Sequence, residues 1–207
     1  MADGVIGRRG RNALQAEQRQ RTRALILAAA TELFNERGYS ETSIAPILAR
    51  AAVSRAAFYA HFDSKLALIC AIAEEFKPTW RPVFAHLVTL RTPSLAALED
   101  WATRYLAFHQ DYRAVCGVLT QVTSLEERLY QEISAQRDAL IAYLGTRYPA
   151  FAAAAHDADA RLRARLLLWQ MDQTCFFVVH GRTPDPGQGA PRLIAEQLYS
   201  FLQRHSR

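Results

Sequence analysis

The chain has 207 residues, half of them hydrophobic and 22% charged, which suffices for the cores of one or two globular domains. Its formal net charge of +5 suits a polyanionic partner, and the first 65 residues carry most of it, with ten Lys or Arg against six Asp or Glu. No segment is apolar over the length of a membrane span, and the N-terminus has no apolar leader core. We therefore expect a cytoplasmic protein without a membrane partner.

Residue types that often mark catalytic or metal sites are scattered along the chain. Cys70, Cys116 and Cys175 each lie in an apolar stretch, as buried reduced thiols do, and no pair has metal-ligand spacing. The six histidines are dispersed, and GxSxG, HExxH, P-loop and CxxC motifs are absent. The sequence therefore predicts no catalytic residue, no metal and no cofactor, and it disfavours an enzyme as the alternative class.

The first predicted elements are an arm and a group of helices. Residues 1–17 contain three arginines and three glycines, which predicts a flexible basic arm or a solvated tail without a role. A helix is expected over 18–37, and shorter helices after Thr42, after Ser54 and near Ser64. Residues 18–66 are therefore predicted to form a small three-helix domain.

The rest of the chain predicts a larger helical bundle. Pro78 and Pro82 interrupt the helical periodicity. Longer helices are expected over 94–112, 124–148, 157–180 and 192–204, with a loop rich in glycine and proline at 181–191. The sequence thus predicts an all-α protein whose second domain covers residues 67–207.

Residues 42–65, TSIAPILARAAVSRAAFYAHFDSK, have the pattern of a helix-turn-helix followed by the start of another helix. Thr42 or Ser43 can cap the first short helix, and Ser54 can cap the second. Phe58 would face the core from the second helix. This order of caps, turn and short second helix is what a pair of helices needs to read DNA, although a structural helical corner would share much of it.

Small and polar side chains occupy the outer face of the second short helix. Arg55 can form a bidentate hydrogen bond with guanine, and Ala56 allows a close approach to the base edges. Phosphates can be held by hydroxyl, imidazole and ammonium groups and by the free N–H groups where the next helix begins. The candidate DNA-binding residues are Thr42, Ser43, Ser54, Arg55, Ala56, Tyr59, His61 and Lys65.

These residues resemble the N-terminal domain of repressors of the TetR/AcrR type. The resemblance rests on ILAAATELFNERGYSETSI at 26–44, AAVSRAAFYAHF at 51–62 and SK at 64–65. It implies that the candidate residues other than Ala56 occupy the family's DNA-contacting positions.

Three positions depart from the family pattern, without removing a phosphate contact. Ala52 stands in place of the turn glycine, Leu48 in place of an alanine, and Leu66 in place of an acid. If the turn requires a left-handed backbone, alanine there costs on the order of 1 kcal/mol.

The resemblance also implies a C-terminal domain that binds a small-molecule effector. Two aromatic stripes at helical spacing could line its pocket, although such stripes also form ordinary cores. We expect a bulky apolar or aromatic effector, oriented by Asp172 or Gln173. The candidate pocket residues are Trp101, Tyr105, Phe108, Trp169, Asp172, Gln173 and Phe176.

Apolar faces on the last two predicted helices indicate a homodimer, because the resemblance implies that these helices pair across a two-fold axis. The alternative is a monomer in which the same faces pack internally. The faces consist of Leu162, Leu166, Trp169 and Val178 on one helix, and of Leu193, Ile194, Leu198 and Phe201 on the other.

The resulting hypothesis is a ligand-responsive regulator of transcription. Two recognition helices about one duplex turn apart would read a palindromic site on double-stranded DNA. The effector would release this repressor from its operator. A DNA-binding regulator without a small-molecule ligand, or an activator, is the alternative.

Overall fold

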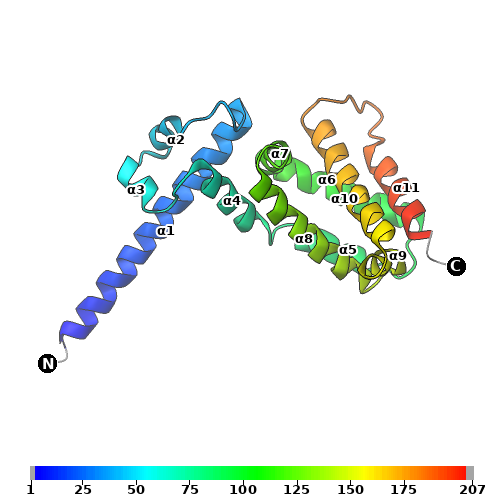
Figure 1. Ribbon diagram of the computed structural model, residues 1–207, viewed down its shortest axis with the longest axis horizontal. Helices are drawn as coiled ribbons and strands as arrows, with labels where there is room; N and C mark the ends of the chain where they lie inside the picture. The colour runs from blue at the N-terminus through cyan, green and yellow to red at the C-terminus, as the bar shows by residue number, and fades with distance from the viewer. Residues whose placement is uncertain (1–2, 204–207) are drawn as a thin grey trace. The chain divides into compact units, whose positions relative to one another are not determined.

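The computed structural model describes residues 3–203, and this part of the chain contains helices and no strand (Figure 1). The predicted all-α class is therefore confirmed. The chain divides into two compact units, Met1–Ile72 and Ala73–Arg207. The sequence placed the division after residue 66.

The helices of the first unit are α1 (Asp3–Arg37), α2 (Ile44–Ala51), α3 (Arg55–Tyr59) and most of α4 (Lys65–Phe76). Those of the second unit are α5 (Arg81–Thr89), α6 (Leu95–Asp111), α7 (Arg113–Val122), α8 (Glu127–Gly145), α9 (Pro149–Ala152), the 3₁₀ turn η1 (Ala153–Ala155), α10 (Ala158–Val179) and α11 (Ala190–Gln203).

Helix α1 begins much earlier than the sequence predicted. It is continuous from Asp3 to Arg37, whereas a flexible basic arm was expected over residues 1–17. Residues 1 and 2 lie outside the described part. The physical reason is that adding a residue to an existing helix costs far less than nucleating one, so the strong formers after residue 12 can extend it through glycines that each cost about 1 kcal/mol.

The core of the first unit lies where α1 meets α2 and α3. Ile26, Leu33 and Phe34 on α1 are almost completely buried, as their helical spacing predicted. Ile47 on α2 and Phe58 on α3 are both 0% exposed. Burying each such side chain stabilises the fold by about 1.5–3 kcal/mol, so α3, although only five residues long, is held by tertiary packing.

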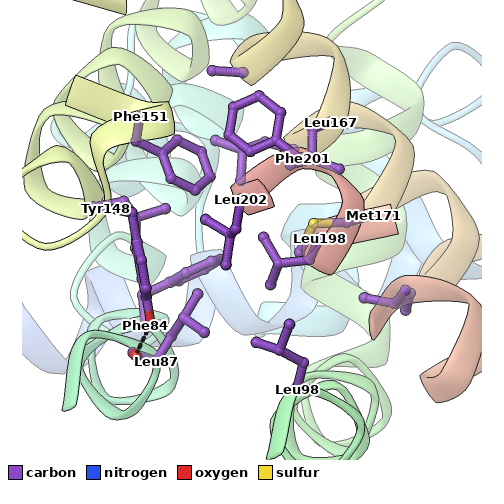
Figure 2. Close-up of a cluster of buried hydrophobic side chains, with 14 of the residues drawn as sticks. Phe84, Leu87, Leu98, Tyr148, Phe151, Leu167, Met171, Leu198, Phe201 and Leu202 are labelled. Atoms are coloured by element: carbon purple, nitrogen blue, oxygen red, sulfur yellow. Dashed lines mark hydrogen bonds between the residues drawn. The ribbon is translucent and has the colours of Figure 1, made fainter. Parts of the chain in front are cut away.

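The second unit is a bundle in which α6 packs against α10 and α11. Its apolar centre draws side chains from α5, α6, α8, α9, α10 and α11, including Phe84, Leu98, Met171 and Leu198 (Figure 2). The hydroxyl of Tyr148 donates a hydrogen bond to the carbonyl oxygen of Leu87 at 2.6 Å, which satisfies a polar group inside this core.

Three helices of the bundle, α5, α7 and the short α9, were not predicted. Pro82 was expected to break the helical pattern, yet it lies in the first turn of α5, where its missing N–H is not needed. Helix α7 covers Arg113–Val122, directly after α6, and these residues lie between the helices that the sequence predicted at 94–112 and 124–148. Within residues 3–203, none of the helices has the length and hydropathy that crossing a bilayer requires.

Candidate functional site

Helix α3 is held by a cap at its N-terminus and by the burial of one face. Ser54 has an extended backbone, and its Oγ accepts a hydrogen bond from the amide of Ala57 at 3.1 Å, so it is the predicted N-cap. Phe58 is buried beneath the helix and contacts Phe62 at a ring-centroid distance of 5.8 Å. The cap and the buried ring hold α3 in place, so its outer face has a fixed orientation within the unit.

The outer face of α3 carries the side chains that the sequence predicted. Arg55, Ala56 and Tyr59 are all exposed. The guanidinium carbon of Arg55 lies 5.9 Å from the ring centroid of Tyr59, a loose cation–π contact that leaves its donors available. Ser43 is the N-cap of α2, and its hydroxyl makes no capping hydrogen bond. It is exposed, so its hydroxyl can reach a phosphate oxygen.

Two of the predicted phosphate-binding side chains have structural roles instead of free surface positions. Thr42 is 1% exposed, and its hydroxyl donates to the carbonyl oxygen of Gly38 at 2.8 Å. Lys65 is half-buried, and its ammonium donates to the carbonyl oxygens of Tyr39 at 2.8 Å and Thr42 at 3.1 Å. Lys65 thus fastens the loop between α1 and α2 onto the start of α4, and Thr42 ties the same loop to the end of α1. Sequence position alone could not distinguish this from phosphate contact.

Two arginines of α1, which the sequence analysis passed over, flank the end of α3. Arg19 donates to the carbonyl oxygen of Ala60 at 3.2 Å, and the guanidinium carbon of Arg23 lies 5.4 Å from the ring centroid of Phe62. Burial and the charges of both arginines lower the pKa of the neighbouring His61. His61 is therefore a neutral hydrogen-bonding group at pH 7. The four-residue spacing of the arginines is the signal that could have placed them on one face.

The turn between α2 and α3 has a left-handed backbone, the case in which the sequence predicts a cost for alanine at position 52. Ala52 has φ 53° and ψ 42°, and its amide donates to the carbonyl oxygen of Ala49 at 3.3 Å. An alanine there carries steric strain that a glycine would not.

The second unit contains a cavity of about 120 Å³. Five of the predicted pocket residues line it: Tyr105, Phe108, Trp169, Asp172 and Gln173. Further wall residues come from α4, α5, α7 and α8, and they include Phe76, Phe84, Cys116, Thr120, Thr123, Gln136 and Leu140.

Two predicted pocket residues do not line this cavity. Trp101 is 0% exposed in the core, where its indole N–H donates to the carbonyl oxygen of Val83 at 2.9 Å and its ring stacks on Tyr105. Phe176 packs instead against His180, at a ring-centroid distance of 4.7 Å. The helical stripe places both residues near the correct region, but a rotation of a few tens of degrees about the helix axis decides between wall and core.

A polar cluster in the cavity wall is centred on Asp172. Its carboxylate accepts hydrogen bonds from the hydroxyl of Tyr105 and from the guanidinium of Arg137, and His109 Nε2 lies 3.7 Å from its Oδ1. The guanidinium carbon of Arg137 also lies 3.9 Å from the ring centroid of Trp169. The cluster joins α6, α8 and α10, and it combines one anion with one cation.

The surroundings fix the protonation of this cluster. Burial by itself would raise the pKa of Asp172, but the Arg137 charge, the nearby His109 and the hydrogen bond from Tyr105 outweigh it and lower the pKa to about 2. Burial raises the pKa of Cys116 to about 12, so its thiol is protonated. Arg137, His109 and Cys116 were missed by the sequence analysis because each is an isolated polar residue on an amphipathic helix.

The predicted dimer faces are only partly exposed. Leu162, Leu166 and Leu193 are 54%, 56% and 55% exposed. Ile194, Leu198 and Phe201, which were assigned to the same interface, are buried in the core of their own unit, and that assignment is wrong. The stripe continues instead through Phe177, which is 44% exposed and lies fifteen residues after Leu162 on the same face of α10.

Sequence similarity to known proteins is found in the first unit. Residues 26–72 match the family described as bacterial regulatory proteins, tetR family. A segment of 63 residues is 40% identical to the HTH-type transcriptional regulator TtgR and, equally, to the probable HTH-type transcriptional regulator ArpR, both of Pseudomonas putida. The match spans 30% of this chain and 30% of each regulator.

Similarity to solved structures extends over nearly the whole chain. A TetR-like transcriptional regulator from Rhodococcus sp. RHA1 has a TM-score of 0.65 at 21% identity, covering 88% of this chain and 96% of the other. A bacterial regulatory protein in the tetR family from Rhodococcus RHA1 has a TM-score of 0.56 at 26% identity, covering 89% and 96%. The fold of the second unit is thus shared, whereas its sequence has diverged.

Proposed function

We propose that the chain is a regulator of the TetR type, since residues 26–72 match that family, and that it regulates transcription by binding a palindromic DNA operator as a homodimer and leaving it when an effector binds. The observation that carries this proposal is the outer face of α3. It exposes Arg55, Ala56 and Tyr59 on a capped helix whose opposite face is buried. This is a DNA-reading surface, and its chemistry favours a regulator over an enzyme.

The contact chemistry follows from the exposed groups. Arg55 would read a guanine in the major groove, with Ala56 allowing close approach. Ser43, Ser54, Tyr59 and neutral His61 would donate to phosphate oxygens and fix the register without reading sequence. Lys65 would act mainly by holding the loop before α2 in place.

A dimer is supported by the exposed leucines of α10 and α11. Leu162 and Leu166 are one helical turn apart, and each exposes more than half of its surface to water in the single chain. A second copy that covered these side chains would gain about 25 cal/mol for each Å² of apolar area buried. Two copies related by a two-fold axis would present two α3 helices to the half-sites of a palindrome.

The effector response is supported by the cavity around Asp172. Its walls are mostly apolar, with a few converging polar groups, which is the usual composition of a small-molecule site. A ligand that binds one arrangement of the two units more tightly than the other would shift the population away from the DNA-bound form. A regulator without a ligand, or an activator, would leave this cavity without a role in DNA binding.

Selection from a random DNA pool, followed by anisotropy titration, tests DNA binding. We expect a palindromic site with affinity that falls steeply as salt rises, because each neutralised phosphate releases counterions. Arg55→Ala should cost about 1–3 kcal/mol on the selected site and relax the preference at one base pair of each half-site. Arg192→Ala, an exposed arginine of α11, is the matched control and should bind normally.

Two outcomes would contradict the proposal. Selection that enriches no sequence would remove sequence-specific regulation. A light-scattering mass near the 23.3 kDa of one chain at micromolar concentration would remove the homodimer.

A further inference from the structure

The cavity of the second unit retains polar capacity that the protein does not use. Within residues 3–203, three buried side-chain nitrogen or oxygen atoms have no hydrogen-bond partner. Two of them, Arg137 Nη1 and His109 Nδ1, belong to residues that line the cavity. An unpartnered buried polar atom is costly, so two in one wall indicate a missing partner rather than a packing accident.

The two atoms require opposite partners. Arg137 Nη1 is a donor, because a guanidinium stays protonated and carries no acceptor. The other terminal nitrogen of Arg137 already donates to Asp172. His109 Nε2 lies 3.7 Å from Asp172 Oδ1, so an imidazole that carries its proton on Nε2 directs that proton at the carboxylate. Nδ1 is then an acceptor. A single hydroxyl group can satisfy both atoms, because it accepts one hydrogen bond and donates another.

The charge of the wall selects against ions. Asp172 and Arg137 form a half-buried pair, with side-chain exposures of 27% and 14%, and their charges cancel. An anionic ligand would place a second negative charge beside Asp172, and a cationic ligand would place a second positive charge beside Arg137. The remaining walls are uncharged and include the aromatic rings of Phe76, Phe108 and Trp169.

We propose that the effector site of this protein takes uncharged aromatic compounds bearing a hydroxyl group, which accepts a hydrogen bond from Arg137 and donates one to His109. This inference rests on the proposed effector response and narrows its ligand class. Asp172, which the sequence analysis chose as the orienting group, has a positioning role: it holds Arg137, His109 and Tyr105 and does not contact the ligand.

Calorimetric titration of the full chain at pH 7 with three matched probes tests the proposal. The probes are 4-propylphenol, propylbenzene and 4-propylbenzoate. We expect 4-propylphenol to bind at least about tenfold more tightly than either of the others, because only it satisfies both atoms without adding charge. Equal binding of propylbenzene, tighter binding of the benzoate, or no binding of 4-propylphenol at millimolar concentration would overturn the proposal.

Variants test whether the preference for 4-propylphenol over propylbenzene arises from the proposed residues. The double substitution Arg137→Leu with Asp172→Leu removes the buried pair together, an exchange that proteins commonly tolerate. It should bring the affinities of the phenol and propylbenzene to within about twofold of each other. The matched control is Arg165→Leu with Asp138→Leu, a pair whose Nε–Oδ1 distance is 2.7 Å and which lies outside this cavity. It should keep the preference.

A second variant tests the same preference if the double variant does not fold. His109→Phe preserves the ring shape and removes the acceptor, and it should lower the phenol affinity while leaving that of propylbenzene unchanged. An undiminished phenol preference in His109→Phe would overturn the proposal. DNA release is measured separately: phenol binding with the expected preference but without release supports the ligand class and contradicts the ligand-gated regulation.

Discussion

The two units use polar side chains in opposite ways. On α3 of the first unit, Arg55 and Tyr59 are exposed, and they add little to the stability of the fold. In the second unit, Asp172, Arg137 and His109 are gathered in a cavity wall, where each depends on the others. Groups of the first kind are free to meet a partner, whereas groups of the second kind first have to satisfy one another.

This difference predicts where substitutions will act. A change on the outer face of α3 should alter DNA binding and leave unfolding almost unchanged, because no buried group loses its partner there. A change in the Asp172 cluster should unfold the protein more readily, because it leaves buried polar atoms unpaired. The following predictions test this contrast.

The largest expected effect is that of Asp172→Leu. It leaves the Arg137 charge uncompensated in the cavity wall and removes the acceptor of the Tyr105 hydroxyl. Removing one partner of a buried ion pair typically costs about 3–5 kcal/mol, so we expect a loss of that size in the free energy of unfolding, measured by urea denaturation at pH 7.

The control is Asp138→Leu, which removes one partner of a more exposed pair. The side chain of Asp138 is 44% exposed and that of its partner Arg165 is 40% exposed, so the loss of Asp138 should cost no more than about 1 kcal/mol. Equal losses in the two variants would show that the Asp172 cluster is no more demanding than a surface ion pair, and the contrast between the units would fail.

Acid should weaken the second unit through the same carboxylate. The pKa of Asp172 is lowered to about 2 in the folded protein, below the value of about 3.9 expected for the unfolded chain. The stabilisation is therefore complete well above pH 4 and is lost as the pH falls towards 2. Between pH 6 and pH 3 the stability difference between the native protein and Asp172→Asn should shrink by about 1 kcal/mol, as measured by urea denaturation at both pH values. A difference that stays constant would show that Asp172 has an ordinary pKa.

The sequence was sufficient for the first unit because its determinants are local. Ser54, Phe58 and Arg55 lie within five residues, and the cap, the buried face and the exposed face all follow from helical spacing. It did not reveal the hydrogen-bond partners of Thr42 and Lys65, which are backbone carbonyls in a loop. A sequence pattern shows that a hydroxyl or an ammonium is present, but it does not show which carbonyl oxygen lies beside it.

The second unit could be predicted as helices but not as a site. Tyr105, Arg137 and Asp172 are far apart in the chain, and no spacing rule brings three helices together at one carboxylate. The helical stripe of α11 was likewise correct in being apolar, but it could not reveal that Ile194 faces its own bundle while Leu193 faces water. Both errors concern the packing partner of a face, which depends on tertiary structure.

The smallest expected effect returns to the turn of the first unit, where one residue carries strain without any polar partner. Ala52 has φ 53°, so Ala52→Gly should relieve the clash of its Cβ and raise the free energy of unfolding by about 0.5–1 kcal/mol, after the greater entropy of an unfolded glycine is subtracted. The same substitution at exposed Ala49, inside α2, should lower it by about 1 kcal/mol. Urea denaturation of both variants gives opposite signs if the backbone of the turn is left-handed in solution. Two losses of equal sign would show that it is not, and α3 would then be held by its buried Phe58 and its Ser54 cap alone.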